Sequence, residues 1–164
     1  MEAKMETSFS NISGIFKINT EVINRAIADV KPEDWFRKPG DDSNHLMWLL
    51  GHLVVHRGHV LKTLGHEWDS SWASLFARGS EHVADQEYPS IEEMMDSWTK
   101  TSEQLRAALR ESSEDVLAKP APPGPPSFDK KVSGTVAFFA FHDAYHAGQA
   151  SFVRKWLGYG QTVG

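Results

Sequence analysis

Cysteine is absent from the 164 residues of this sequence. The chain therefore offers no disulfide, thiolate metal ligand or cysteine nucleophile, and any sulfur in a reaction must come from a substrate. Long apolar runs are also missing, since no stretch approaches the roughly 20 apolar residues that a membrane-spanning helix needs. The first residues do not lead into the apolar segment typical of a secretory signal. We therefore expect a soluble, cytoplasmic protein that does not cross a membrane.

A basic surface stripe is not evident either. The chain has 17 lysines and arginines against 22 acidic residues, a net charge of -5, and its basic residues are scattered. Nucleic-acid-binding proteins usually gather basic residues on one face, so we expect a small-molecule substrate and no nucleic acid. The length fits a single domain over residues 1–164 with a substantial core. We expect residues 1–7 to be disordered.

Apolar residues recur at helical spacing in four segments of the chain. We predict helices at about residues 9–30, 43–64, 90–110 and 132–157. Pro32 ends the first helix and Gly65 the second, and Ser90 and Glu93 match the capping box that begins the third. Residues 65–89 are expected to form a long packed loop, and the proline-rich residues 119–127 a semi-rigid connector inside the domain.

Four amphipathic helices without a strand pattern predict an all-α fold, a four-helix bundle. The short link between the first two helices favours antiparallel neighbours. About 25 residues join the second helix to the third, which is long enough to let these two run parallel.

Eight histidines carry most of the functional information. His142 and His146 are four residues apart on the last helix and so share one face. Imidazoles inside a bundle need polar partners, and one divalent ion would satisfy both. A third ligand must come from another helix, and His52 lies near the edge of the inward stripe of the second helix. Three imidazoles and a water form a tetrahedral zinc site with one exchangeable position, although nickel, iron or manganese also accept such ligands.

A single His-x-x-x-His pair is weak evidence, because His52 and His56 form another. His56 could therefore replace one of the three ligands. Outside the proposed ligand set, we assign the remaining histidines mainly to surface or structural roles: His45, His56, His59, His66 and His82. The paired Glu-x-x-His motifs of di-iron bundles and the His-Glu-x-x-His motif of zinc proteases are both absent.

Two longer motifs resemble those of a known family. Residues 44–53, Asn-His-Leu-Met-Trp-Leu-Leu-Gly-His-Leu, are similar to the second-helix motif of the DinB/YfiT-like metalloenzymes. Residues 142–149, His-Asp-Ala-Tyr-His-Ala-Gly-Gln, resemble the family's fourth-helix motif, His-x-x-x-His-x-Gly-Gln. The similarity extends to residues 37–39, 72–79 and 88–93, and so covers most of the chain in the family's order.

The resemblance implies an up-down-down-up four-helix bundle, often a homodimer, with His52, His142 and His146 as ligands of one divalent metal ion. Gln149 matches the motif's glutamine, which implies a role in orienting a ligand or the substrate. A buried amide that bonds a neighbouring helix is the alternative for this residue. Characterised relatives include thiol-dependent S-transferases and a thiol-dependent isomerase.

These observations favour a metal-dependent enzyme, a thiol-dependent S-transferase that uses a low-molecular-weight thiol from solution. The alternatives are a metal-dependent hydrolase and a non-enzymatic, metal-binding dimeric bundle. The sequence identifies no general base. Asp143 follows a proposed ligand directly, but one residue along a helix turns its side chain about 100° away from that of His142.

Overall fold

A computed structural model describes residues 2–163 of the protein, with side chains from Phe9 onward. The fold is all-helical: α1 (Glu2–Ile27), α2 (Leu46–Thr63), α3 (Ile91–Glu111), α4 (Glu114–Leu117) and α5 (Val132–Trp156), with short 3-10 helices at Pro32–Asp34, Ala73–Phe76 and Asp85–Glu87. Residues 2–163 contain no strand, and Pro120 and Lys131 form an isolated β-bridge. Disorder of residues 1–7 stays a prediction: Met1 lies outside the described residues, and residues 2–7 are described only by their backbone, at the start of α1.

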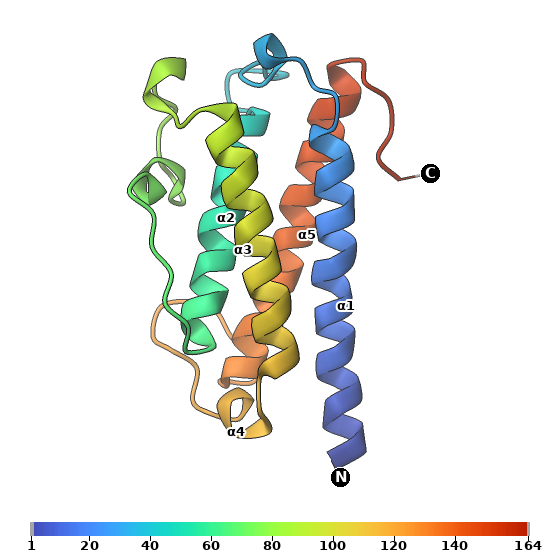
Figure 1. Cartoon of the computed structure of the whole chain (residues 1–164), viewed down its shortest axis with the longest axis vertical. Helices are drawn as coiled ribbons and strands as arrows, with labels where there is room; N and C mark the ends of the chain where they lie inside the picture. The colour runs from blue at the N-terminus through green and yellow to red at the C-terminus, as the bar shows by residue number, and fades with distance from the viewer. Residues whose placement is uncertain (1, 164) are drawn as a thin grey trace.

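The four long helices lie side by side, and the short α4 lies at one end (Figure 1). In this view α1 and α5 run upward from the lower end, whereas α2 and α3 both run downward. The crossover, residues 66–90, returns the chain from the lower end of α2 to the upper end of α3. No helix in the described part of the chain is both long and apolar enough to span a membrane.

The four predicted helices correspond to the four long helices, with shifted ends. Helix α2 begins at Leu46 rather than Ser43, because the ring of His45 caps it: His45 Nδ1 accepts a hydrogen bond from the Trp48 backbone N–H at 3.1 Å. At the start of α3, Ser90 Oγ accepts the predicted bond from the Glu93 N–H at 3.1 Å. The sequence pattern did not predict α4, whose four residues are too few to show a period.

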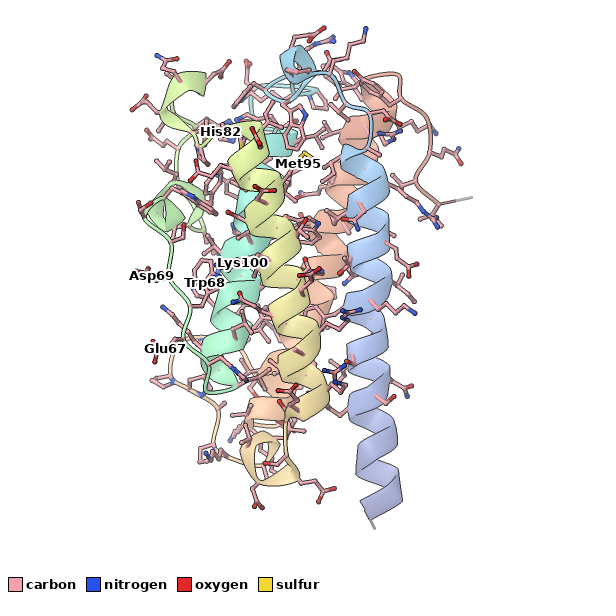
Figure 2. All side chains as sticks on the ribbon, viewed as in Figure 1. Glu67, Trp68, Asp69, His82, Met95 and Lys100 are labelled. Carbon is pink, nitrogen blue, oxygen red and sulfur yellow. The ribbon has the colours of Figure 1, made fainter. Side chains whose placement is uncertain are left out.

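Aromatic rings of the crossover pack against two glycines of α2. A Cβ atom at Gly51 would lie 2.4 Å from the ring of Phe76, and one at Gly58 would lie 2.2 Å from the ring of Trp68. Figure 2 shows Trp68 directed from the crossover toward α2. Because neither ring could fit over a side chain, these glycines allow the crossover to pack directly on the helix backbone, as expected of a packed loop.

A buried arginine connects all four long helices. Arg57, on α2, donates to both carboxylate oxygens of Asp143 on α5, at 3.0 and 2.8 Å. Its Nη1 also donates to Thr20 Oγ1 of α1 at 2.9 Å and to Ser102 Oγ of α3 at 2.8 Å. The guanidinium lies over the ring of Trp98, 4.1 Å from the ring centroid. The side chains of the ion pair are 2% and 3% exposed, so neither charge is compensated by water.

We predict that Asp143→Asn destabilises the fold by about 3–5 kcal/mol, because it leaves the Arg57 cation buried without its counter-charge. Urea unfolding followed by circular dichroism measures the loss. Asp96→Asn, which removes a charge from the exposed face of α3, is the matched control and should change stability by less than about 0.5 kcal/mol. A similar small change for Asp143→Asn would show that the pair contributes little to the fold.

Candidate metal centre

Four histidines meet where α2 packs against α5. His52 and His56 are one turn apart on α2, and His142 and His146 are one turn apart on α5. Neighbouring ring centroids are 4.2 Å apart for His52 and His56, 4.2 Å for His56 and His142, 4.5 Å for His142 and His146, and 4.6 Å for His146 and His52. The two helices run in opposite directions (Figure 1), so the two pairs face each other as a quadrilateral of rings.

The imidazole of His52 is held on two sides. Its Nδ1 donates to the backbone carbonyl of Phe76 at 2.7 Å, which leaves the Nε2 lone pair free. The indole of Trp48 stacks on the imidazole of His52, with the two ring centroids 4.5 Å apart and the rings tilted by 17°. Trp48 is itself fixed by a bond from its Nε1 to Ser80 Oγ at 3.1 Å. The crossover therefore orients a histidine of α2 through both Phe76 and Ser80.

His146 is oriented by the residue that the motif places three positions later. Its Nδ1 bonds the side-chain oxygen of Gln149 at 2.7 Å. The amide nitrogen of Gln149 in turn lies 3.4 Å from the hydroxyl of Tyr145. Gln149 thus contacts a proposed ligand directly, and its hydrogen bonds to described residues go to His146 and Tyr145 of the same helix.

Two pairs of ring nitrogens, both of which include His142 Nε2, are spaced like two ligands of one metal ion. His142 Nε2 lies 3.4 Å from His52 Nε2 and 3.2 Å from His146 Nε2. Zinc–nitrogen bonds of about 2.0–2.1 Å at a tetrahedral angle separate two ligand nitrogens by about 3.3 Å. The group whose ligand nitrogens all lie within 4.8 Å of one another consists of His52, His56 and His142, so it contains His56 in place of His146. The cluster could therefore hold a metal ion, and His56 belongs to it.

Burial keeps these imidazoles neutral. Loss of solvation lowers the pKa of His52 and of His142 from 6.5 to about 4, and that of His56 to about 2. Burial also lowers the pKa of His146. A neutral imidazole has the lone pair that a metal ion needs, so at neutral pH no proton has to leave before an ion binds.

The sequence pattern indicates a mainly surface or structural role for His56, with ligand replacement as the alternative, and the structure places His56 inside the cluster. His45 is buried as the cap of α2, and His82 Nε2 bonds Asn44 Oδ1 at 3.1 Å, so both have structural contacts. His59 is exposed. Sequence analysis missed the carbonyl of Phe76, because a backbone acceptor leaves no trace in a side-chain pattern.

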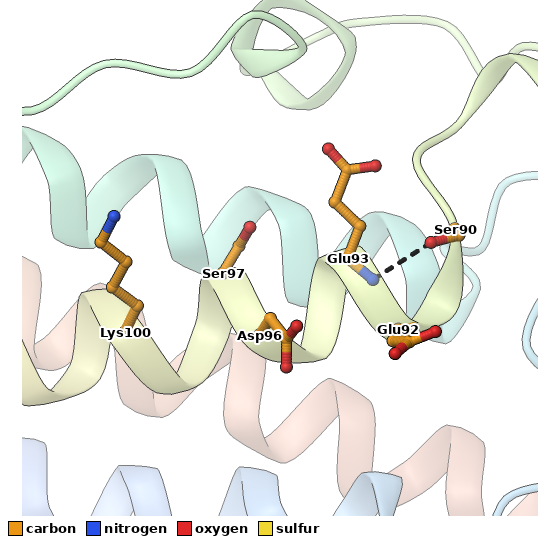
Figure 3. Close-up of a pocket in the computed structure, with 6 residues that line it drawn as sticks. All are labelled: Ser90, Glu92, Glu93, Asp96, Ser97 and Lys100. Carbon is orange, nitrogen blue, oxygen red and sulfur yellow. Dashed lines mark hydrogen bonds between the residues drawn. The ribbon is translucent and has the colours of Figure 1, made fainter.

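A hollow along α3 lies apart from the histidines (Figure 3). Its walls come from α3 and its cap alone: Ser90, Glu92, Glu93, Asp96, Ser97 and Lys100. Every one of these side chains is exposed or half-buried, and the bond drawn among them is the helix cap from the Glu93 N–H to Ser90. This hollow lacks the buried, converging polar groups that make the histidine cluster the candidate site.

Comparison with known proteins identifies a family for this chain. The family model described as the DinB superfamily matches residues 15–150, a range that contains all four clustered histidines and Gln149. No curated protein matches the chain.

We predict that the metal-free protein loses stability as the pH falls from 6.5 to about 4. Within that window the unfolded chain protonates His52 and His142 at their ordinary pKa of 6.5, whereas the folded chain binds those protons only near pH 4. Urea unfolding at several pH values measures how steeply the free energy of unfolding changes with pH. The double variant His52→Gln and His142→Gln should have a shallower slope between the two limits. An unchanged slope would mean that these rings are protonated normally in the fold.

Proposed function

Because the chain belongs to the DinB superfamily, we propose that it is a metal-dependent enzyme in which His52, His142 and His146 bind one divalent ion. The observation that carries this proposal is the pair of nitrogen–nitrogen separations around His142 Nε2, 3.4 and 3.2 Å, which suit a tetrahedral ion. Zinc fits three neutral imidazoles best, and nickel, iron and manganese are the other candidates. An up-down-down-up bundle, supported by the long crossover between α2 and α3, is part of the same proposal.

The residues around the ligands have distinct tasks in this proposal. The carbonyl of Phe76 and the side chain of Gln149 hold the Nδ1 atoms of His52 and His146, so that both Nε2 atoms point to one place. Such outer contacts fix ring orientation and raise the basicity of the ligand. The stacked indole of Trp48 excludes water from one side of His52. Gln149 therefore acts as a positioning residue.

The reaction that we propose is thiol-dependent S-transfer with a small organic substrate. A divalent ion in this site would supply Lewis-acid chemistry and lower the pKa of a thiol or a water at its open position. The chain has no cysteine, so the thiol must be a low-molecular-weight compound from solution. Hydrolysis by activated water is the second candidate, and a metal-binding bundle without activity is the third.

We also propose that the protein is a homodimer. Helix α5 carries four large exposed apolar side chains at helical spacing: Phe141, Tyr145, Phe152 and Trp156, between 43% and 61% exposed. These four side chains form an exposed apolar stripe along α5, and exposed apolar patches are typical of interfaces. Tyr145 joins the stripe to the metal centre, because its ring lies 5.1 Å from that of His146.

We predict that protein purified without a polyhistidine tag binds one divalent ion per chain and that His146→Ala lowers the affinity at least tenfold, since a ligand is lost. Elemental analysis and competition with a chelator measure both quantities. His66→Ala, which changes a histidine outside the cluster, is the matched control and should keep the ion.

Circular dichroism should show that the helices persist in His146→Ala, and any thiol-dependent turnover should disappear with the metal. Wild-type protein that folds normally but binds no ion would contradict the proposed function. A His146→Ala variant with unchanged affinity would remove His146 from the ligand set.

We predict that Phe152→Glu converts the dimer to a monomer, because it places a charge in the middle of the apolar stripe. Sedimentation at micromolar concentration measures the mass. Phe128→Glu is the control, since Phe128 is 70% exposed and lies outside α5. A monomeric wild-type protein would refute the dimer without affecting the metal site.

A further inference from the structure

His56 lies as close to the metal centre as the three proposed ligands lie to one another. Its ring centroid is 4.2 Å from that of His52 and 4.2 Å from that of His142. These same three histidines form the group whose ligand nitrogens all lie within 4.8 Å. The site therefore presents a fourth imidazole where three would suffice for a centre with one open position.

We propose that His56 is a fourth, exchangeable ligand of the same ion. It occupies the coordination position that His52, His142 and His146 leave open, and an incoming thiol or water displaces it. This inference rests on the proposed function, because it requires that the three-histidine site binds an ion.

The ring of His56 carries a buried nitrogen atom without a hydrogen-bond partner. His56 Nδ1 is buried and has no hydrogen-bond partner among the described residues. A buried polar atom without a partner is unfavourable, so such atoms are rare unless a ligand, an ion or a water completes them. Coordination through Nδ1 would satisfy this nitrogen.

His56, rather than His52 or His146, is the ligand that an incoming molecule would displace from the ion. His52 and His146 are 2% and 7% exposed, and a hydrogen bond from each Nδ1 fixes its ring. His56 is only half-buried, and its Nδ1 has no such bond to hold the ring in place. Its ring is therefore less restrained than those of His52 and His146. His142 is also half-buried with an unpartnered Nδ1, but its Nε2 lies 3.4 and 3.2 Å from the Nε2 atoms of His52 and His146.

The cluster suits one ion rather than two. Two divalent ions that shared His52 and His142 would lie close together and repel strongly, unless an anionic ligand lay between them. The clustered group contains neutral imidazoles and no carboxylate. The adjacent Asp143 is not available, because both of its oxygens accept from Arg57. The four rings are therefore best assigned to a single ion.

Cobalt(II) is a suitable probe, because its visible absorption reports the number and type of its ligands. Wild-type protein without a tag is stripped with a chelator and loaded with cobalt, beside His56→Ala, His56→Gln and His59→Ala. His59 is the matched control, since it lies on the same helix three residues away and is exposed. We expect both His56 variants to change the spectrum and to bind cobalt about tenfold more weakly, while His59→Ala matches the wild type.

A thiol titration separates an exchangeable ligand from a permanent one. Added 2-mercaptoethanol should bind the cobalt of both His56 variants at lower concentration than in the wild type, because no imidazole has to leave first. If His56 were a permanent ligand, thiol would not displace it in the wild type, and the spectrum of the wild type would not respond.

The outcomes also distinguish the two proposals. Wild-type protein that takes up no cobalt would overturn the proposed function and, with it, this inference. Wild-type protein that binds cobalt with a spectrum and affinity unchanged in both His56 variants would overturn the role of His56 alone. His56→Gln keeps a polar side chain of similar reach, so that a folding defect in His56→Ala does not leave the question unanswered.

Discussion

The bidentate ion pair of Arg57 and Asp143 is the contact on which the arrangement of the bundle depends. The guanidinium of Arg57, on α2, bonds side chains from α1, α3 and α5 and also lies over the ring of Trp98. A buried charge of this kind is destabilising unless each of its donors finds a partner, so it penalises any packing that shifts one helix along another. The pair therefore fixes the register of the helices more strongly than apolar contacts alone would.

This register also sets the geometry of the metal centre. Arg57 follows His56 directly on α2, and Asp143 follows His142 directly on α5. The two successors bond each other on one side of the contact between α2 and α5, and the histidines meet on another. A slip of either helix by one turn would break the ion pair and separate the imidazoles. Structural and functional residues thus alternate along the same two helices.

The sequence predicted the four long helices well, because their apolar residues keep helical spacing and their ends carry glycine, proline or serine. It also singled out His52, His142 and His146, whose Nε2 atoms lie 3.2–3.4 Å apart in two pairs, whereas the group with all ligand nitrogens within 4.8 Å contains His56 in place of His146. The ion pair could have been inferred, since Arg57 and Asp143 each occupy an inward position between apolar residues. The cap at His45 could not, because histidine is an uncommon cap and Ser43 nearby is a common one.

The place of His56 was harder to predict for a different reason. Helical spacing puts His52 and His56 on one side of α2, but whether the second ring reaches the centre depends on how α5 packs across it. That packing is a long-range property, decided by residues such as Arg57 that are far in sequence from their partners. The family motif did not help, because the resemblance implies only three ligands and says nothing of their neighbours.

Gly51 has an effect on a site that it does not touch. Its missing side chain leaves room for the ring of Phe76, and the carbonyl of that same residue selects the tautomer of His52 that is protonated at Nδ1. A methyl group at position 51 would displace the ring and withdraw the acceptor with it. The proton could then move to Nε2, the atom that faces His142, and occupy the lone pair. Chemistry at the histidines is in this way coupled to the absence of a single carbon atom at the preceding position of the helix.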